Sequence, residues 1–441
     1  MTAPDVGLDQ IDEAAAPSLG STRSRVFWTF ADQALSSLTN AALALVVAKS
    51  VSKNEFGAFS LALVSFAFIV GLSRSMIGDP FVVRFTDASA GVRRRATAHA
   101  AGAAVVFGLA AGAVCAVAAM LLAGQARMAL LALALSLPGL VLQETWRHTF
   151  FSAGRPRAAT INDLIWTVVQ FVLLAALLLS GHASIFLITG SWGFAATLAA
   201  LIGVLQTGIR PAPLATVAWF RATRDLNVRM GLDFALNMGA VNLAIFLVTG
   251  LVGLVGAGAL RAAQVLLGPL NLLFAGVSAF ILPMLSKRAG NGRISGLAGL
   301  TSLANGTIAA GWVGILLLLP KSVGVEVLGE SWDGARSVMA GSGIVSVAVA
   351  FVIGPSLGLK ALRRADQMLR VTFLQAPIML GLGAFGAWQW GAPGAAYGFA
   401  VAQVFGLVVC WSIFIQADRA PRSWLGPERT SGTVLGQRRR H

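Results

Sequence analysis

The chain has 441 residues, of which 56% are hydrophobic and only 12% are charged, and its mean hydropathy is +0.77. A soluble domain carries about 25% charged residues, so this composition excludes an ordinary soluble fold and favours a multi-pass membrane protein. The formal net charge of +15 is scattered between apolar runs, which excludes the single basic face of a nucleic-acid-binding domain.

The chain begins with a polar segment, residues 1–22, that carries acidic side chains and lacks the apolar core of a signal peptide. We expect a disordered cytoplasmic tail here, with the first membrane helix serving as an uncleaved insertion signal. A second polar tail, residues 417–441, is basic and is also expected to be disordered and cytoplasmic.

Between the tails, apolar runs of about 20 residues recur, each long enough to cross a bilayer as an α-helix. None shows the alternation of membrane β-strands. The sequence therefore predicts an all-α polytopic protein. The twelve expected spans are 28–48, 56–77, 97–123, 128–150, 159–180, 184–207, 230–254, 259–284, 296–320, 336–357, 369–389 and 394–416.

Lys and Arg are distributed unevenly over the two sides that these spans define. Of the 33 such residues, the side opposite the tails holds only Lys49, Lys53, Arg127, Arg261, Lys321 and Arg336. Because cytoplasmic loops carry the excess of positive charge, both termini are expected in the cytoplasm, and the location is expected to be the bacterial inner membrane.

The two halves of the chain share matching residues in the same order. Asp32 and Gly57 are 25 residues apart, and so are Asp233 and Gly258. A repeat of six helices enters the bilayer in the same direction twice, so its two copies are related by an axis along the membrane normal.

We therefore expect two pseudo-symmetric lobes, 23–207 and 230–416, with a site between them near the midplane. A cytoplasmic linker, 208–229, would join the lobes. Within it, Leu214–Arg224 is predicted either as a short amphipathic helix on the membrane surface or as a plain basic connection.

Three stretches carry a family resemblance as a set. They are Ala48 to Phe59, Gly258 to Asn271 with Leu282 to Ser286, and Arg147 to Asp163. Together they resemble the polysaccharide-exporter branch of the multidrug/oligosaccharidyl-lipid/polysaccharide (MOP) flippase superfamily. The resemblance implies a MATE-like transporter fold whose helices 1, 2, 7 and 8 face a central cleft. It also implies the flipping of a lipid-linked oligosaccharide or polysaccharide precursor.

Residues 87–95 are similar to a loop signature of the major facilitator superfamily, which is an alternative fold. That signature requires glycine where this chain has Val83, and a shorter spacing than the one from Asp87 to Gly91. We interpret the segment as a positively charged cytoplasmic loop.

The eighth span carries polar and small residues at helical spacing. They are Arg261, Gln264, Gly268, Asn271, Ala275 and Ser278. These positions share one face, which either lines a hydrated substrate-binding cleft or packs against another helix. We favour the cleft, because the Arg261 guanidinium requires water or an anion.

Two aspartates, Asp32 and Asp233, lie at equivalent positions one turn inside the first and seventh spans. With Asn237 they are candidates for a gate or for binding a coupling cation, and Asn40 is a further cleft candidate. The alternative is that each aspartate complements the dipole of its helix.

Arg74 and Arg147 end the second and fourth spans on the cytoplasmic side. With Arg261 they are candidates to attract a phosphate or pyrophosphate head group, because guanidinium groups match phosphate geometry. The alternatives are anchoring at the membrane interface and, for Arg147, pairing with Glu144 on the same helix.

Cysteine and histidine give no sign of a metal site, a disulfide framework or a cofactor. Cys115 and Cys410 both lie inside apolar runs, and no cluster of histidine, cysteine and carboxylate is visible. We therefore expect neither a metal nor a cofactor.

The leading prediction is a transporter that moves an anionic lipid-linked saccharide from the cytoplasmic to the outer leaflet by alternating access. Its partners would be membrane lipids and polysaccharide-synthesis proteins, with no nucleic acid. The alternatives are a cation-coupled multidrug antiporter of the same fold, a major-facilitator-type transporter and a membrane-embedded polymer-synthesis enzyme. The enzyme is disfavoured because the longest outer loop, 321–335, is short and holds no histidine.

Overall fold

The computed structural model describes residues 19–86, 88–289, 292–362, 364 and 366–420, and these residues form helices and no strand. The helices are α1 (Leu19–Ser50), α2 (Lys53–Ser73), the π-helical turn η1 (Arg74–Gly78), α3 (Asp79–Phe85), α4 (Ala90–Met120), α5 (Gly124–Ser152), α6 (Pro156–Leu179), α7 (Ile185–Thr207), η2 (Pro213–Ala215), α8 (Thr216–Ala222), α9 (Arg224–Ala289), α10 (Ser295–Leu318), α11 (Lys321–Leu328), η3 (Gly329–Ser331), α12 (Trp332–Ala361) and α13 (Asp366–Arg419). Most of both predicted tails, 1–18 and 421–441, lies outside the described residues.

Each of the twelve predicted ranges falls mainly on a helix, although 56–77 continues from α2 into η1 and 97–123 extends past the end of α4. Two helices each hold two of the ranges. The helix α9 is broken at Gly253, where φ is +71°, and α13 is broken at Gly391, where φ is +64°. Glycine suits both breaks because it reaches positive φ without steric cost. Within the described residues, nine helical stretches are long and apolar enough to cross a membrane, so the number twelve stays a prediction.

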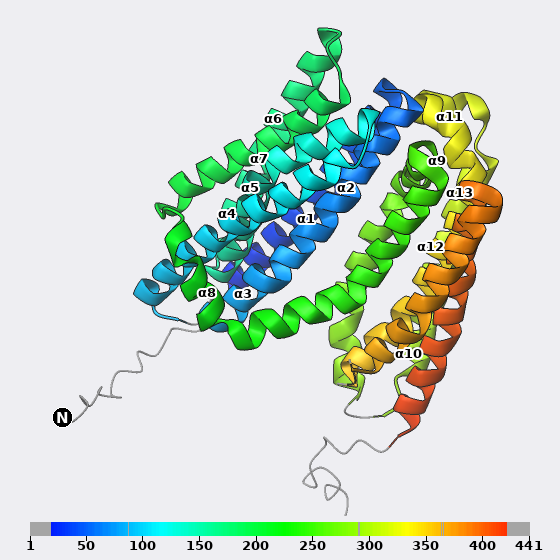
Figure 1. The fold of residues 1–441 in the computed structure, drawn as a ribbon. Coiled ribbons are helices and arrows are strands. Elements are labelled where there is room, and N and C mark those ends of the chain that lie inside the picture. The colour runs from blue at the N-terminus through cyan, green and yellow to red at the C-terminus, as the bar shows by residue number, and fades with distance from the viewer. Residues whose placement is uncertain (1–18, 87, 290–291, 363, 365, 421–441) are drawn as a thin grey trace, which may run out of the picture.

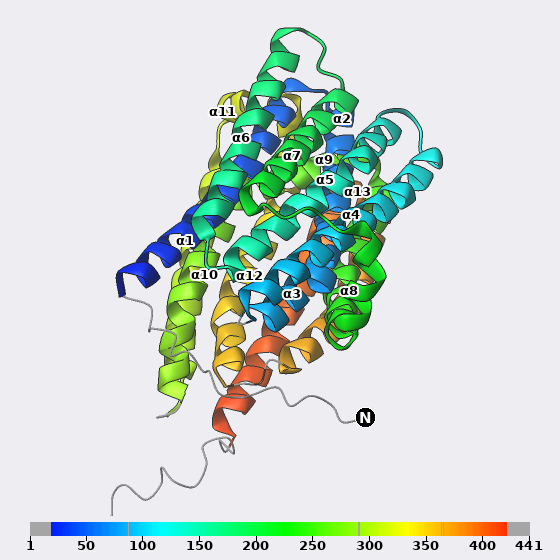
Figure 2. The same ribbon diagram turned by 90° about the vertical axis from the view of Figure 1, so that its left-hand side faces the viewer.

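The helices form two groups, each centred on its own apolar core. Helices α1, α2 and α4 to α7 pack around residues such as Phe56, Leu133 and Leu137, whereas α10, α12, α13 and the second half of α9 pack around residues such as Leu285 and Phe414. At one end, Leu328 of α11 and Trp332 of α12 also join the first core. The groups lean together at the end where α11 lies and diverge toward the opposite end (Figure 1). The view turned by 90° shows the helices of both groups running in roughly the same direction (Figure 2).

Glycines at equivalent positions of the predicted repeat bring the two groups into contact. A Cβ added to Gly57 of α2 would lie 1.9 Å from the carbonyl oxygen of Leu254 in α9. A Cβ added to Gly258 would lie 3.3 Å from the carbonyl oxygen of Lys53. Leu254 follows Lys53 by the same 201 positions that separate the glycines. Reciprocal contacts of this kind are what a two-fold axis produces, so they support the repeat.

The segment between the two groups contains the short helix α8, which includes much of the predicted stretch Leu214–Arg224. Its Trp219 is 2% exposed and packs against Phe81, with ring centroids 6.3 Å apart, and against Phe85. This aromatic side chain therefore packs against α3, whereas Arg221 at the end of α8 is exposed.

Candidate functional site

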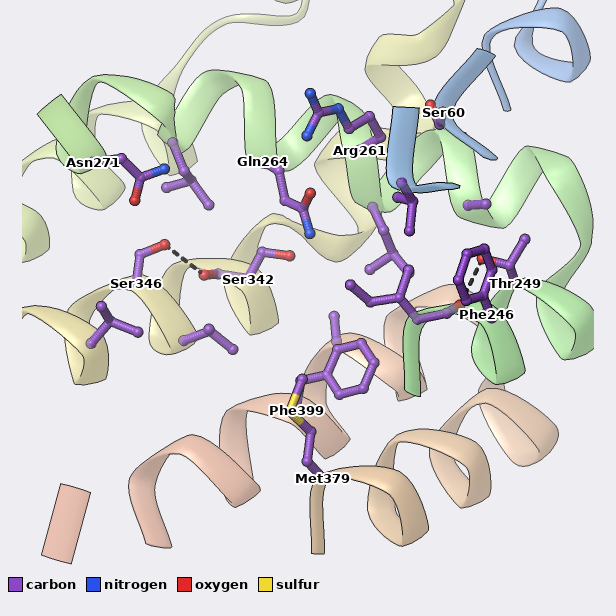
Figure 3. A pocket seen from close by; sticks show the side chains of 18 of the residues that line it. Ser60, Phe246, Thr249, Arg261, Gln264, Asn271, Ser342, Ser346, Met379 and Phe399 are labelled. Atoms are coloured by element: carbon purple, nitrogen blue, oxygen red, sulfur yellow. Dashed lines mark hydrogen bonds between the residues drawn. The ribbon is translucent and has the colours of Figure 1, made fainter. Parts of the chain in front are cut away.

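A cavity of about 340 Å³ lies between α2, α9, α12 and α13, where the two helix groups meet. This volume falls within the range of ligand-binding cavities, about 300–1,000 Å³. Most of its lining is apolar and includes Phe246, Phe274, Met379 and Phe399 (Figure 3). Its polar lining residues are Ser60, Thr249, Arg261, Gln264, Asn271, Ser342 and Ser346.

Of the four predicted cleft residues that α9 carries, three line this cavity. Arg261, Gln264 and Asn271 all line it, as their helical spacing requires (Figure 3). Ser278 lies farther along α9 and is not among the lining residues; its hydroxyl donates to the carbonyl oxygen of Phe274 at 2.7 Å. The other wall carries Ser342 and Ser346 on α12, and the Ser346 hydroxyl donates to the Ser342 carbonyl oxygen at 3.2 Å.

Arg261 is the charged member of this lining, as far as the described residues extend. Its Nε is buried without a hydrogen-bond partner, and it takes part in none of the ion pairs of the described chain. The Arg261 side chain as a whole is half-buried. A half-buried guanidinium without a counter-charge is unfavourable, and a bound anion would relieve that cost. The cavity therefore has the chemistry of an anion site with apolar surroundings.

A second group of charges lies inside the first helix group and joins α1, η1, α5 and α6. We call it the N-lobe charge cluster, and its members are Asp32, Arg74, Glu144, Arg147, His148 and Asp163. Arg147 donates to Asp32 Oδ2 from Nη2 at 2.5 Å and from Nε at 2.8 Å. Arg74 donates to Glu144 Oε1 at 2.5 Å, and His148 Nε2 lies 3.3 Å from the same oxygen.

The third carboxyl group of the cluster belongs to Asp163 on α6. Its Oδ2 lies 3.8 Å from Arg147 Nε, and its Oδ1 accepts from Gln143 at 2.6 Å. Two guanidinium groups thus face three carboxyl groups, so the cluster holds no surplus of positive charge. The pairing of Glu144 with Arg147 considered from sequence is present at 3.8 Å, but Glu144 bonds Arg74 more closely.

Three residues that the sequence analysis proposed for the cleft or its gate belong to this cluster instead of the cavity. Arg74, Arg147 and Asp32 do not line the cavity; each is engaged with a partner of opposite charge in the N-lobe charge cluster. Asp32 is 0% exposed, and its carboxylate is bonded by the guanidinium of Arg147. That guanidinium therefore occupies the place that a coupling cation would take. Asn40 lines a separate space of about 10 Å³, room for about one water molecule, beside Asp163.

Two further gating candidates, Asp233 and Asn237, have side chains outside the described residues, although their backbone belongs to α9. Their neighbour Phe234 packs against α2, where a Cβ on Gly71 would meet its ring at 2.4 Å. The first half of α9 therefore contacts the first helix group, whereas its second half belongs to the other group.

Sequence reasoning missed Asp163, His148, Ser342 and Ser346. The positions of Asp163 and Glu144 inside apolar spans were a usable signal of a charge cluster, because a carboxylate in a membrane needs a cationic partner. Nothing in the sequence distinguished Ser342 and Ser346 from the many serines that bond within their own helix. Among the described residues, no group of three histidine, cysteine or carboxylate side chains is arranged to hold a metal ion.

Comparison with protein families and with curated proteins finds no match to this chain. Solved structures do match. One is titled a lipid II flippase MurJ in an inward closed conformation, with a TM-score of 0.69 and 11% identity over 89% of this chain and 90% of that one. Another, an inward-facing multidrug resistance MATE family transporter of the MOP superfamily, has a TM-score of 0.65 and 13% identity, covering 87% and 94%.

A third match is a MOP superfamily transporter from Pyrococcus furiosus, which is described as having a binding pocket of reverse polarity. Its TM-score is 0.55 and its identity 11%, covering 90% of this chain and 95% of that one. The chain therefore has the all-helical MOP transporter fold, as the resemblance implied. This fold removes the major-facilitator alternative.

Proposed function

We propose that this protein flips an anionic lipid-linked saccharide from the cytoplasmic to the outer leaflet of a bacterial inner membrane. The observation that carries the proposal is the guanidinium of Arg261, which has no counter-charge among the described residues of a largely apolar cavity between two lobes. Such a cavity suits an amphiphile with a charged head, because the cation binds phosphate oxygens while apolar walls receive the rest.

Alternating access would use the contact between the lobes at the α11 end. There Leu328 and Trp332 share one apolar core with Val47 and Val51, and Gly57 packs against Leu254. By the distribution of Lys and Arg this is the outer end. We propose that substrate enters from the cytoplasmic side and leaves when this outer contact opens.

The membrane potential would favour the proposed direction. Moving one negative charge outward, from a negative interior, releases about 2.3 kcal/mol per 100 mV. Proteins that assemble the saccharide on its lipid carrier would supply the substrate, and polysaccharide-synthesis proteins are therefore the proposed partners.

A cation-coupled multidrug antiporter of the same fold is less well supported. Cationic drugs need an acidic side chain at their site, and the described lining of the cavity contains no carboxylate. The carboxylates of the N-lobe charge cluster are held by Arg74 and Arg147.

The test is a flipping assay in proteoliposomes with a fluorescent lipid-linked saccharide. We expect Arg261→Ala to lower the rate by about tenfold or more, the equivalent of about 1.4 kcal/mol, and Arg261→Lys to keep part of it, since lysine retains the charge but not the planar fork. Arg221→Ala, which removes an exposed arginine outside the cavity, is the matched control.

Two results would count against the proposal. Flipping at the wild-type rate by Arg261→Ala would remove the anion site from the mechanism. Export of a cationic dye by the wild-type protein, unaffected by this substitution, would favour the antiporter.

A further inference from the structure

The described lining of the cavity offers a single fixed positive charge. Arg261 is the charged residue of its described lining, and the internal repeat does not supply a second one. The residue 201 positions before Arg261 is Ser60, which lines the same cavity. Its hydroxyl is used within α2, donating to the Phe56 carbonyl oxygen at 2.7 Å. Two equivalent positions of the repeat thus face one cavity, and only one carries charge.

The two arginines of the N-lobe charge cluster do not add to this charge. Arg147 is bound to Asp32, and Arg74 to Glu144, each at 2.5 Å. Releasing either one toward a substrate would leave a buried carboxylate without its partner, which is a large cost. The cavity therefore balances one negative charge and not two.

We infer that the head group carried by this protein bears a single negative charge, as in a phosphodiester or a carboxylate, and is not a diphosphate. This inference rests on the proposed function. A monoanion would neutralise Arg261, whereas a diphosphate joining a lipid to a sugar would leave one charge uncompensated among apolar side chains. The amides of Gln264 and Asn271 and the hydroxyls of Ser342 and Ser346 are uncharged groups, suited to sugar hydroxyls.

The experiment measures dissociation constants of the full-length protein in an uncharged detergent, followed by tryptophan fluorescence. Two matched pairs of probes are used. The first pair is polyprenyl-phosphate glucose and polyprenyl-diphosphate glucose, which differ by one phosphate. The second pair is glucuronosyl diacylglycerol and glucosyl diacylglycerol, which differ by one carboxylate.

For the wild-type protein we expect the phosphodiester to bind about tenfold or more tightly than the diphosphate. A preference for the glucuronosyl over the glucosyl lipid as well would show that both a phosphodiester and a carboxylate are accepted. A preference in the phosphate pair alone would identify a phosphodiester, and one in the carboxylate pair alone a carboxylate.

Two substitutions test whether the number of positive charges in the cavity sets the preference between the head groups. Gln264→Arg places a second guanidinium one turn from Arg261 at an exposed position of the cavity wall, and is expected to reverse the preference toward the diphosphate. Gln264→Met, which adds no charge, is its control. Arg261→Gln is expected to abolish the difference between glucuronosyl and glucosyl lipids, and its size-exclusion profile checks that it is folded.

The outcomes separate this inference from the proposed function. Tighter binding of the diphosphate than of the phosphodiester by the wild-type protein would overturn the inference and leave an anion flippase intact. If no anionic lipid bound more tightly than the neutral glucosyl lipid, the anion site itself, and with it the proposed function, would be lost.

Discussion

At the scale of single residues, the Arg147–Asp32 ion pair joins helices that are far apart in the chain. The two residues are separated by 115 positions, and their side chains are 14% and 1% exposed. Removing either side chain leaves the other buried and charged without a partner. Each of the two charges is therefore tolerated inside the lobe because the other is present.

We predict that Arg147→Ala destabilises the protein by about 3–5 kcal/mol, the cost of breaking a buried ion pair. Neutralising both partners, as Asp32→Asn with Arg147→Gln, should cost less than the sum of the single substitutions, because neither residue then leaves the other as a buried charge without its partner. Thermal unfolding in detergent measures both effects. Strict additivity would mean that the two residues do not act as a pair.

Asp418 gives a second residue-scale prediction. Its carboxylate accepts from the backbone N–H groups of Ile294 at 3.1 Å and Ser295 at 3.0 Å, where α10 begins. Asp418→Ala should cost about 1–2 kcal/mol of stability, as removal of a helix N-terminal partner does. Asp225→Ala, which removes an exposed carboxylate paired with Arg84, should cost about 0–1 kcal/mol. Equal losses in thermal unfolding would contradict this assignment.

At the scale of elements, the approach of α2 to α9 depends on glycine. The Cβ of alanine at position 57 would meet backbone atoms of Leu254, which cannot move aside as the end of a side chain can. At Gly258 the corresponding approach is 3.2 Å, so less has to shift. The contact at the outer end is therefore more sensitive at Gly57 than at its symmetry mate.

We predict that Gly57→Ala weakens this contact and moves the lobes apart at the α11 end. Spin labels on cysteines at His182, between α6 and α7, and at Ser322 of α11 would report a longer distance by pulsed electron spin resonance. Gly258→Ala should change this distance less. Gly250→Ala, where no atom lies within 4 Å of the added Cβ, should leave it unchanged, and a similar shift in all three variants would refute the explanation.

At the scale of the whole molecule, the orientation in the membrane follows from the distribution of positive charge. Ser89, between α3 and α4, and Ser322, in α11, are exposed and lie toward opposite ends. The native cysteines, Cys115 and Cys410, are buried, so replacing them with alanine provides a background for labelling.

In that background, a cysteine at Ser322 should react with an impermeant maleimide added to intact cells. A cysteine at Ser89 should react only after the membrane is made permeable. Labelling of both positions from the same side would contradict the predicted topology and, with it, the pairing of the six-helix halves.

The sequence by itself determined the features that depend on local pattern and on the bilayer. The length of the apolar runs indicates helices, because backbone N–H and C=O groups in lipid must be hydrogen-bonded within the protein. The spacing of Arg261, Gln264 and Asn271 placed them on one face, which the structure finds lining the cavity. The offset between Asp32 and Asp233 revealed a repeat that the contact of Gly57 with α9 supports.

Only the tertiary structure decided which arginines are paired with a carboxylate. In sequence, Arg74, Arg147 and Arg261 look alike, since each is a guanidinium at or near the end of an apolar run. The fold brings carboxylates from other helices to Arg74 and Arg147 and none, among the described residues, to Arg261. Charge compensation acts through space between residues 70 and 115 positions apart. The periodicity of a single helix therefore cannot predict it.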